Sequence, residues 1–238
     1  MEIIIDSQLV RDIVSQETDE ASAEIEMLGV IAAYRRSLER LDQRLSSAKD
    51  APTLACKAGC SWCCYFSVDV RPVEVFNILE FVERQLTPNE RDRIRKEIAT
   101  NKLLLEQLSE QERATRNIKC PFLASGRCTI YAARPQTCRN YHATDATGCQ
   151  RSYEQPNNVD IDPEFAPVVY QVGGAHVDAF SKAMSDADYD TDAYELSTAL
   201  SAAMSSPDIA RQRFEAKLKP FVDVQGNDVP LEFVELDE

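Results

Sequence analysis

The sequence lacks the features that direct a chain into a membrane or out of the cell. No apolar run approaches the roughly 18 residues that a membrane-spanning helix needs. The first residues, M-E-I-I-I-D-S, lack the basic region and the longer apolar region of a signal peptide. We therefore expect a cytoplasmic protein that has no membrane as a partner.

The chain also lacks an excess of positive charge. It has 26 Lys and Arg residues against 40 Asp and Glu residues, which gives a formal net charge of -14. Nucleic-acid-binding proteins usually present basic surfaces to the phosphates. We therefore expect no nucleic acid partner. A protein partner is compatible with this composition, but nothing in the sequence identifies one.

Familiar catalytic motifs are missing as well. The sequence contains no G-x-G-x-x-G, no G-x-x-x-x-G-K-S/T, no H-E-x-x-H and no G-x-S-x-G. It has only two histidines, and no H-x-E precedes its cysteines as in the zinc deaminases. The sequence leaves open whether the protein is an enzyme.

Cysteine is what the sequence does have, in two bunches. The first reads C-K-A-G-C-S-W-C-C over residues 56–64 and the second lies within residues 120–149. Core cysteines would be scattered singly, because a free thiol packs as a small hydrophobic group and gains nothing from clustering. Crowded thiolates repel one another unless a cation lies among them. The bunches therefore predict a soft metal, either zinc or iron, the latter alone or in an iron–sulfur cluster.

A disulfide framework is the alternative use of clustered cysteine. Eight cysteines in 238 residues amount to about 3%, below the density of disulfide-rich secreted domains. A cytoplasmic protein also keeps its thiols reduced by default. Metal binding is therefore the favoured interpretation.

Each bunch has a predicted local structure. If residues 56–64 are helical, the separations of four, three and four place Cys56, Cys60, Cys63 and Cys64 on one face. In the second bunch, Ser125-Gly126 lies between two short apolar runs and predicts a β-hairpin with Cys120 and Cys128 on its arms. A helical hairpin over residues 72–116 should return the second bunch to the first, so that both form one centre.

These residues resemble the YkgJ-type cysteine-cluster family, zinc- or iron-chelating domains named for a C-x-x-C-x-x-C-C signature. The resemblance covers residues 56–142 and lies in C-S-W-C-C, C-P-F-L, G-R-C, I-Y, R-P and C-R-N-Y. The sequence has three residues between Cys56 and Cys60, whereas the tightest signature has two. The related bacterial flagellin lysine methylases share such a cluster, together with further sequence that this chain does not recognisably contain.

All eight cysteines are candidate ligands. The predicted metal set is Cys56, Cys60, Cys63, Cys64, Cys120, Cys128, Cys138 and Cys149. His142 is a further candidate to complete a site, whereas His176 is expected to be structural. Arg134 and Arg139 are candidates to stabilise thiolate charge by hydrogen bonding.

Two kinds of function fit this metal set. Closed cysteine sites could hold zinc, slightly favoured over iron, in a metal-binding protein without catalysis; eight thiolates suit two tetrahedral ions. Alternatively, the protein holds an iron–sulfur cluster and carries out a redox or methylase-like group-transfer reaction.

Apolar spacing predicts a mainly α fold: a helical bundle around a small irregular cysteine-rich core with a short β-hairpin. Helices are expected over residues 6–18, 19–47, 72–86, 88–116, 162–185, 191–204 and 206–218. We divide the chain into an N-terminal helical segment (1–50), a cysteine-cluster metal-binding domain (51–150) and a C-terminal helical segment (151–238). The three segments are expected to pack as one unit.

Overall fold

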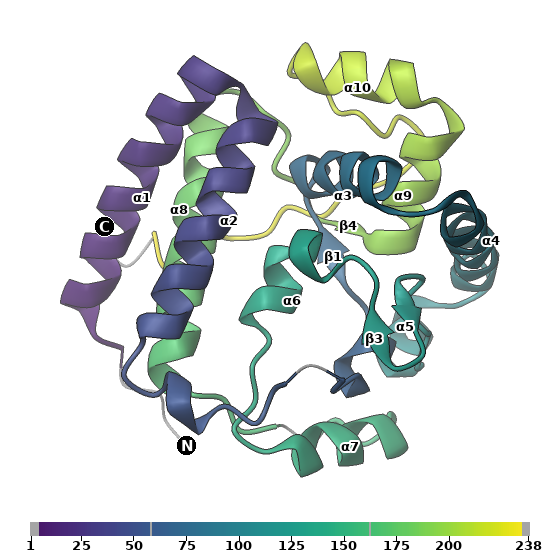
Figure 1. The fold of residues 1–238 in the computed structure, drawn as a ribbon, viewed down its shortest axis with the longest axis horizontal. Helices are drawn as coiled ribbons and strands as arrows, with labels where there is room; N and C mark the ends of the chain where they lie inside the picture. Colours follow the sequence, from purple (N-terminus) through teal and green to yellow (C-terminus); the bar gives the residue numbers. More distant parts are fainter. Residues whose placement is uncertain (1–4, 58, 162, 235–238) are drawn as a thin grey trace.

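Helices dominate the computed structural model, which describes residues 5–57, 59–161 and 163–234. Within these ranges the chain forms ten α-helices, three 3-10 turns and four two-residue strands (Figure 1). The predicted mainly α-helical fold with a short β-hairpin is confirmed. None of the helices in the described ranges has the length and apolar character needed to cross a membrane.

Three long helices form a bundle on one side of the molecule. They are α1 (Ser7–Leu28), α2 (Val30–Ser47) and α8 (Pro167–Asp186), and each packs against the other two (Figure 1). Asp6 caps α1, because its carboxylate accepts a hydrogen bond from the Leu9 amide at 3.1 Å. The bundle brings together segments that are more than a hundred residues apart in sequence.

The break between the first two helices lies at Gly29, and the predicted boundary between residues 18 and 19 is wrong. Helical apolar spacing continues on both sides of this glycine, so the pattern alone does not reveal the turn. Gly29 has φ 81° and ψ 154°, a conformation that is unfavourable for residues with a Cβ. The chain therefore reverses there, and α2 runs back along α1.

A second group of helices lies beside the bundle. It contains α3 (Pro72–Gln85), α4 (Pro88–Leu105), α9 (Leu196–Ser205) and α10 (Pro207–Glu215), with α9 packed against the other three (Figure 1). Helices α3, α4 and α10 each begin with a proline, whose fixed φ suits the first helical turn. The helix predicted over residues 72–86 is confirmed.

Three other predicted helices have different bounds. The segment 88–116 is divided into α4 and the short helix α5 (Glu110–Thr115), because Ser109 caps a new helix with Glu112. Helix α8 begins at Pro167, after extended Ala166, and Asp162 of the predicted start lies outside the described residues. Helix α9 begins at Leu196, because residues 194–195 form a strand.

Two short strands connect the second helical group to the cysteine-bearing part. Strand β1 (Asp69–Val70) pairs antiparallel with β4 (Tyr194–Glu195), with Val70 opposite Tyr194. This pairing joins the start of α3 to the start of α9. Each strand has only two residues, too few for an alternating pattern to appear in the sequence.

One apolar core extends through all three sequence segments. Tyr34 of α2, Phe122 of the cysteine-bearing part and Phe180 of α8 belong to it, and each is 1% exposed or less. A smaller core at the other end of the bundle contains Val10, Ile13, Val14, Val172, Ala175, Ala179 and Phe233. The cysteine-bearing part therefore shares its core with the flanking helices.

A polar network lies inside the bundle, around His176. Glu17, Ser37 and His176 are all 0% exposed. Arg44 donates to Nδ1 of His176 at 2.5 Å, so Nε2 carries the ring proton and donates to the Ser37 hydroxyl at 2.9 Å. That hydroxyl donates to Glu17 at 2.8 Å, and Glu17 also accepts from Arg40 and Arg44. Both ring nitrogens of His176 have partners within this network, which agrees with the expected structural role of this residue.

The network keeps His176 neutral and Glu17 ionised. Burial lowers the pKa of His176 to about 4, although the charge of Glu17 opposes this shift. Burial alone would raise the pKa of Glu17, but hydrogen bonds from Arg40 and Ser37 and the positive partners hold it below its ordinary value. An unfolded chain would protonate His176 near pH 6.5.

These shifts predict how stability depends on pH. Between pH 6.5 and about 4 the unfolded chain binds a proton at residue 176 that the folded chain does not, so stability falls as pH falls. Over this window His176 should account for a loss of about 3 kcal/mol in the free energy of unfolding. We expect the stability difference between the native protein and His176→Gln to shrink by this amount on acidification.

Chemical denaturation at pH 7 and pH 4.5, followed by circular dichroism, measures this difference. Acid effects common to both proteins, such as altered thiol chemistry, cancel in the comparison. His142→Gln is the matched control and should show a smaller change, since His142 is only partly buried. Parallel pH profiles for the native protein and His176→Gln would contradict the assignment.

Candidate metal centre

Six of the eight cysteines line one cavity of about 260 Å³. Three come from the first bunch and three from the second: Cys60, Cys63, Cys64, Cys120, Cys128 and Cys138. The two bunches thus meet in space as predicted, and that their sulfur atoms reach one metal ion stays a prediction. All eight cysteines are free thiols.

Backbone hydrogen bonds join the two cysteine stretches directly. The Cys120 amide donates to the Cys64 carbonyl at 2.8 Å, and the Ile118 amide donates to the Tyr65 carbonyl at 2.9 Å. At the other end of the first stretch, the Ala55 amide donates to the Ala143 carbonyl at 2.8 Å. The chain after α5 is thus held against the segment that follows Cys64.

The first bunch is not an α-helix, so the prediction of one helical cysteine face is wrong. Its regular part is a 3-10 turn, η2 (Trp62–Tyr65), which contains the adjacent Cys63 and Cys64. Gly59 has φ 93° and interrupts any helical path before Cys60. The thiols reach the cavity from an irregular loop and a tight turn.

The predicted β-hairpin is present, with one change. Strand β2 (Leu123–Ala124) pairs with β3 (Arg127–Cys128) across a turn at Ser125 and Gly126, which have φ 50° and 73°. Cys128 lies on the second arm as expected. Cys120 precedes the first arm, in a turn closed by the Leu123 amide and the Cys120 carbonyl.

Cys138 is positioned by the short helix α6 (Gln136–Asn140). Arg139 of this helix is 3% exposed, donates to Asp42 of α2 at 2.7 Å and donates to the Arg134 carbonyl at 3.1 Å. Its guanidinium is therefore used to fasten α6 to the bundle. The predicted role of Arg139 in stabilising thiolate charge has no support in these contacts.

On its other side, α6 packs closely against α8. A Cβ on Gly173 of α8 would lie 1.8 Å from Oδ1 of Asn140. Gly173 and Gly174 both lie within α8, and both allow tight packing. A Cβ on Gly174 would lie 2.2 Å from the ring of Phe233. Glycine at position 173 lets α6, and with it Cys138, lie against the bundle.

Cys56 and Cys149 lie beside the cavity and do not line it. The Cys56 sulfur accepts a hydrogen bond from the Ala143 amide at 3.4 Å. Cys149 is 5% exposed in α7 (Ala146–Glu154), a helix that packs against η2. Burial raises the pKa of Cys149 to about 11, with smaller contributions from Cys56, Cys63 and Cys60. Cys149 therefore lies near the first bunch, to which Cys56 belongs.

Aromatic side chains cover η2 on the side of α7. The ring of Tyr153 lies 5.3 Å from that of Trp62 and 4.8 Å from that of Tyr65, measured between centroids. The Tyr153 carbonyl also accepts a hydrogen bond from Asn117 at 2.6 Å. These contacts hold α7 and Cys149 against the turn that contains Cys63 and Cys64.

Three of the cavity thiols, Cys63, Cys120 and Cys138, resist ionisation when no cation is present. Burial raises the pKa of Cys120 to about 12, and the neighbouring Cys128 and Cys63 add to this. The pKa of Cys138 is raised well above its ordinary value by burial and by Cys120. A hydrogen bond with Cys64, together with burial, raises the pKa of Cys63. Each thiolate would therefore need a compensating positive charge.

Arg134 and Arg139 were both candidates to stabilise thiolate charge, and of the two it is Arg134 that faces the thiols. It lines the cavity, its guanidinium carbon lies 4.2 Å above the ring of Tyr131, and its buried Nε has no hydrogen-bond partner in the described part of the chain. Burial raises the pKa of Cys128, and the charge of Arg134 partly offsets this effect. Its charge therefore acts on the thiols, but no hydrogen bond from Arg134 to a cysteine is seen among the described residues, so the predicted hydrogen-bonding role stays a prediction.

Apolar side chains from distant segments complete the cavity wall. Val68 precedes β1, Phe122 lies between Cys120 and Cys128, and Leu196 begins α9. Sequence reasoning missed Val68 and Leu196, since neither belongs to a cysteine motif. Only the β1–β4 pairing, in which the Leu196 amide donates to the Val68 carbonyl at 2.9 Å, brings them here.

The donor chemistry fits a thiophilic metal, but the side chains do not yet converge on one point. Across residues 5–57, 59–161 and 163–234, no group of three or more His, Cys, Asp or Glu side chains is arranged closely enough to hold an ion. His142 is half-buried near Cys56, and its Nδ1 has no partner among the described residues. The individual ligand assignments, including His142, therefore stay predictions.

Comparison with known families supports a chelating role. Residues 55–162 match the CxxCxxCC family, whose description is "putative zinc- or iron-chelating domain", and this confirms the resemblance seen in the sequence. The matched segment contains all eight cysteines, including Cys56 and Cys149. No curated protein and no solved structure matches the chain. The cysteine-bearing part is thus similar to the domains of this family, and it lies between helices of the same chain.

The packing at Gly173 yields a test of how Cys138 is positioned. Gly173→Ala should push Asn140 and α6 away from α8, because a Cβ cannot occupy the position of the Asn140 side chain. We expect iodoacetamide to modify Cys138 faster in this variant of the reduced, metal-free protein, as followed by peptide mass spectrometry.

Gly174→Ala is the matched control. It adds the same methyl group one residue later, but the added group meets Phe233 in the smaller core and not α6. Both changes should lower stability by about 1–3 kcal/mol through overpacking. Equal labelling rates at Cys138 in the two variants would show that Gly173 does not position this cysteine.

Proposed function

We propose that this protein binds zinc or iron through the thiolates of its cysteine cavity. The observation that carries the proposal is the convergence of six thiols, from stretches more than fifty residues apart, on one cavity. Thiolate-rich sites select zinc, iron and iron–sulfur clusters among the biological metals. The family match to a zinc- or iron-chelating domain supports the same conclusion.

Packing alone is a poor explanation for this arrangement. Grouping buried thiols brings no more apolar contact than scattering them, and Val68, Phe122, Ile130 and Leu196 already supply apolar surface around the cavity. Burial raises the pKa of Cys120 and of Cys138, so these two thiols favour the protonated form until a cation is bound. A metal supplies that charge and releases the thiol protons.

Six cavity thiols exceed the four that one tetrahedral zinc ion takes. Cys56 and Cys149, which lie beside the cavity, bring the total to eight, enough for two zinc ions. Small rotations of the cysteine side chains would be needed to bring a complete set onto one ion. An iron–sulfur cluster would use four of the thiols and leave the others as neighbours.

Each part of the cavity has a distinct task in this proposal. The cysteines hold the metal, which when bound supplies a cross-link between the two stretches or, as an iron–sulfur cluster, an electron-transfer group. Arg134 offsets the excess negative charge of the thiolates. Phe122 and Leu196 keep water from one wall. In the second candidate function, a redox or group-transfer enzyme, the same residues would tune an iron–sulfur cluster.

Metal analysis of protein purified without oxygen tests the proposal. We expect at least one equivalent of zinc or iron per chain, and loss of most of it in Cys63→Ser/Cys64→Ser. The control Ser61→Ala/Ser67→Ala alters two side chains of the same segment and should retain the metal. Native protein that contains neither metal, and does not take one up when it is offered, would refute the proposal.

The absorption spectrum of the same sample distinguishes the metals. A colourless protein with stoichiometric zinc would exclude the iron–sulfur alternative. A brown protein with charge-transfer absorption and stoichiometric iron would exclude zinc as the resident metal. Arg134→Gln should leave the metal in place but shift the charge-transfer bands or the rate of metal release, because it removes the cation beside the thiolates.

Metal removal should loosen the second cysteine stretch before the rest of the protein. Residues 120–149 contain two-residue strands, a 3-10 turn, a five-residue helix and only the start of α7, so little regular hydrogen bonding holds them. Structural zinc contributes on the order of 10 kcal/mol in small zinc-binding peptides. Chelation, or Cys63→Ser/Cys64→Ser, should therefore make peptide bonds between residues 120 and 149 sensitive to protease.

The bundle supplies the internal control for this experiment. Helices α1, α2 and α8 bury their own apolar side chains, so most helical circular dichroism should survive metal removal. Limited proteolysis with mass spectrometry locates the cleavage sites. Unchanged resistance between residues 120 and 149 after complete metal removal would show that the metal does not hold this segment.

A further inference from the structure

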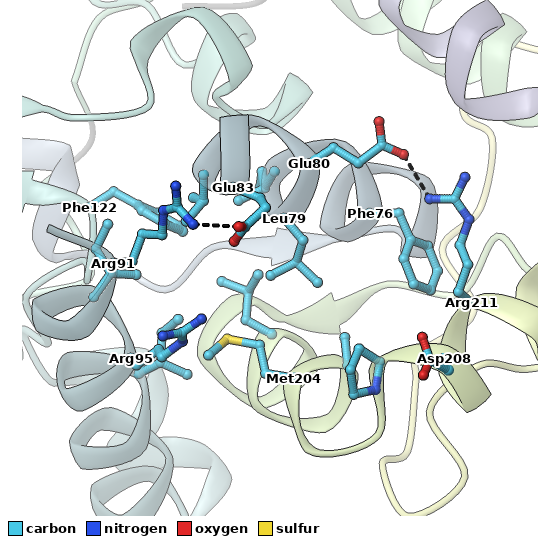
Figure 2. Close-up of a pocket in the computed structure, with 17 residues that line it drawn as sticks. Phe76, Leu79, Glu80, Glu83, Arg91, Arg95, Phe122, Met204, Asp208 and Arg211 are labelled. Carbon is cyan, nitrogen blue, oxygen red and sulfur yellow. Dashed lines mark hydrogen bonds and ion pairs between the residues drawn. The ribbon is translucent and has the colours of Figure 1, made fainter. Parts of the chain in front are cut away.

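A cleft of about 510 Å³ opens between α3, α4, α9 and α10, outside the cysteine cavity (Figure 2). Its volume is within the range of small-molecule sites, about 300–1,000 Å³. The cleft exists between packed helices and requires no rearrangement to form. Neither the family match nor the proposed metal centre accounts for it.

The inner surface of the cleft is apolar. Leu79 of α3, Ile94 and Ile98 of α4, and Leu200 and Met204 of α9 line it. Phe122 contributes to its wall and also to the wall of the cysteine cavity, so the two hollows lie on either side of this residue. An apolar molecular body would be removed from water by this surface.

Some charged residues at the ends of the cleft form ion pairs with other lining residues, whereas Arg95 does not. Arg91 forms an ion pair with Glu83, and Arg211 pairs with Glu80 at 2.7 Å, so these four charges are balanced within the lining (Figure 2). Arg95 pairs in the described structure only with Asp92, at 3.2 Å on the outer surface of α4.

The Arg95 pair is weak enough to yield to a ligand. The two side chains are 56% and 64% exposed, and exposed pairs of this kind contribute little stability. Figure 2 shows Arg91 and Arg95 at one end of the cleft and Asp208 with Arg211 at the other. An anionic group therefore finds an available partner at the α4 end, whereas Asp208 would repel a second anionic group at the far end.

We infer that this cleft binds a small amphipathic monocarboxylate, such as a medium-chain fatty acid. The carboxylate accepts hydrogen bonds from Arg95, and the alkyl chain lies over Leu79, Leu200 and Met204. The apolar lining supplies affinity by burial, and the guanidinium sets the orientation. This inference does not depend on the metal centre.

Methionine methyl groups report binding directly. Met204 lines the cleft, whereas Met184 is 0% exposed in the core and Met27 is 71% exposed on α1. In protein with ¹³C-labelled methionine methyl groups, octanoate should shift the Met204 resonance in a saturable manner. The resonances of Met184 and Met27 should stay in place and serve as internal controls.

Probes that differ only in charge test the carboxylate. Octanoate should bind more tightly than 1-octanol, which has no charge, and than octylammonium, which has the opposite charge. Suberate has the same chain length but a second carboxylate, and it should bind more weakly because of Asp208. Octylammonium or suberate binding as tightly as octanoate would overturn the assignment, as would the absence of a saturable Met204 shift.

Two neighbouring residues of α4 supply matched variants. Arg95→Gln should weaken octanoate binding about tenfold, the effect of losing one hydrogen bond to a charged group. Lys96→Gln removes the same charge one residue later, from an exposed side chain outside the lining, and should change affinity by no more than about twofold.

Titration calorimetry measures both variants, and circular dichroism checks that they fold as the native protein does. Arg95→Lys keeps the charge and should retain part of the affinity. Equal effects of Arg95→Gln and Lys96→Gln would show that the cleft does not use Arg95 to recognise the carboxylate, and would refute the proposal.

Discussion

The hydrogen bond from the Cys120 amide to the Cys64 carbonyl joins the two cysteine stretches, and the shape of the cavity depends on that junction. It places the start of the hairpin beside the turn that contains Cys63 and Cys64. Two short strands and one 3-10 turn could not hold this geometry against water by themselves. The surrounding helices must therefore supply the rigidity that the cysteine stretches lack.

The helical bundle supplies that rigidity at α6. Arg139 reaches Asp42 on α2, and Asn140 lies where only a glycine on α8 leaves room, so Cys138 is fixed from two sides. At the opposite wall, β1 and β4 bring α9 and Leu196 to the cavity. The same residues that complete the fold thus define the cavity, and the flanking helices cannot be regarded as separate appendages of a metal-binding loop.

The sequence was most informative where one residue type has one physical use. Clustered cysteines predicted a shared centre, Ser125-Gly126 predicted the hairpin, and apolar spacing predicted the helix over residues 72–86 that is α3. Gly29 escaped prediction because helical spacing continues on both sides of it. The first cysteine bunch was assigned a helix because its spacing matches 3.6 residues, although Gly59 interrupts that path.

Long-range partners were not predictable from one sequence. Nothing in the sequence near Leu196 indicates that it faces cysteines. Strands β1 and β4 have two residues each and are more than a hundred residues apart in the sequence, so their pairing leaves no recognisable pattern. The choice between Arg134 and Arg139 was likewise open in the sequence, because both flank Cys138. The structure distinguishes them: Arg139 contacts Asp42 and fastens α6 to the bundle, whereas Arg134 faces the thiols.

Phe122 links the two hollows of the molecule in a way that constrains both. Its ring forms part of the cleft wall, while its amide donates a hydrogen bond to the Cys120 sulfur, which lowers the thiol pKa against the larger effect of burial. A rotation of this residue would change the apolar surface of the cleft and the polarity around Cys120 together. Because Phe122 is 1% exposed and belongs to the main core, its contacts with that core oppose such a rotation. The wall between the hollows is therefore stiff, and an occupant of the cleft would meet a preformed surface.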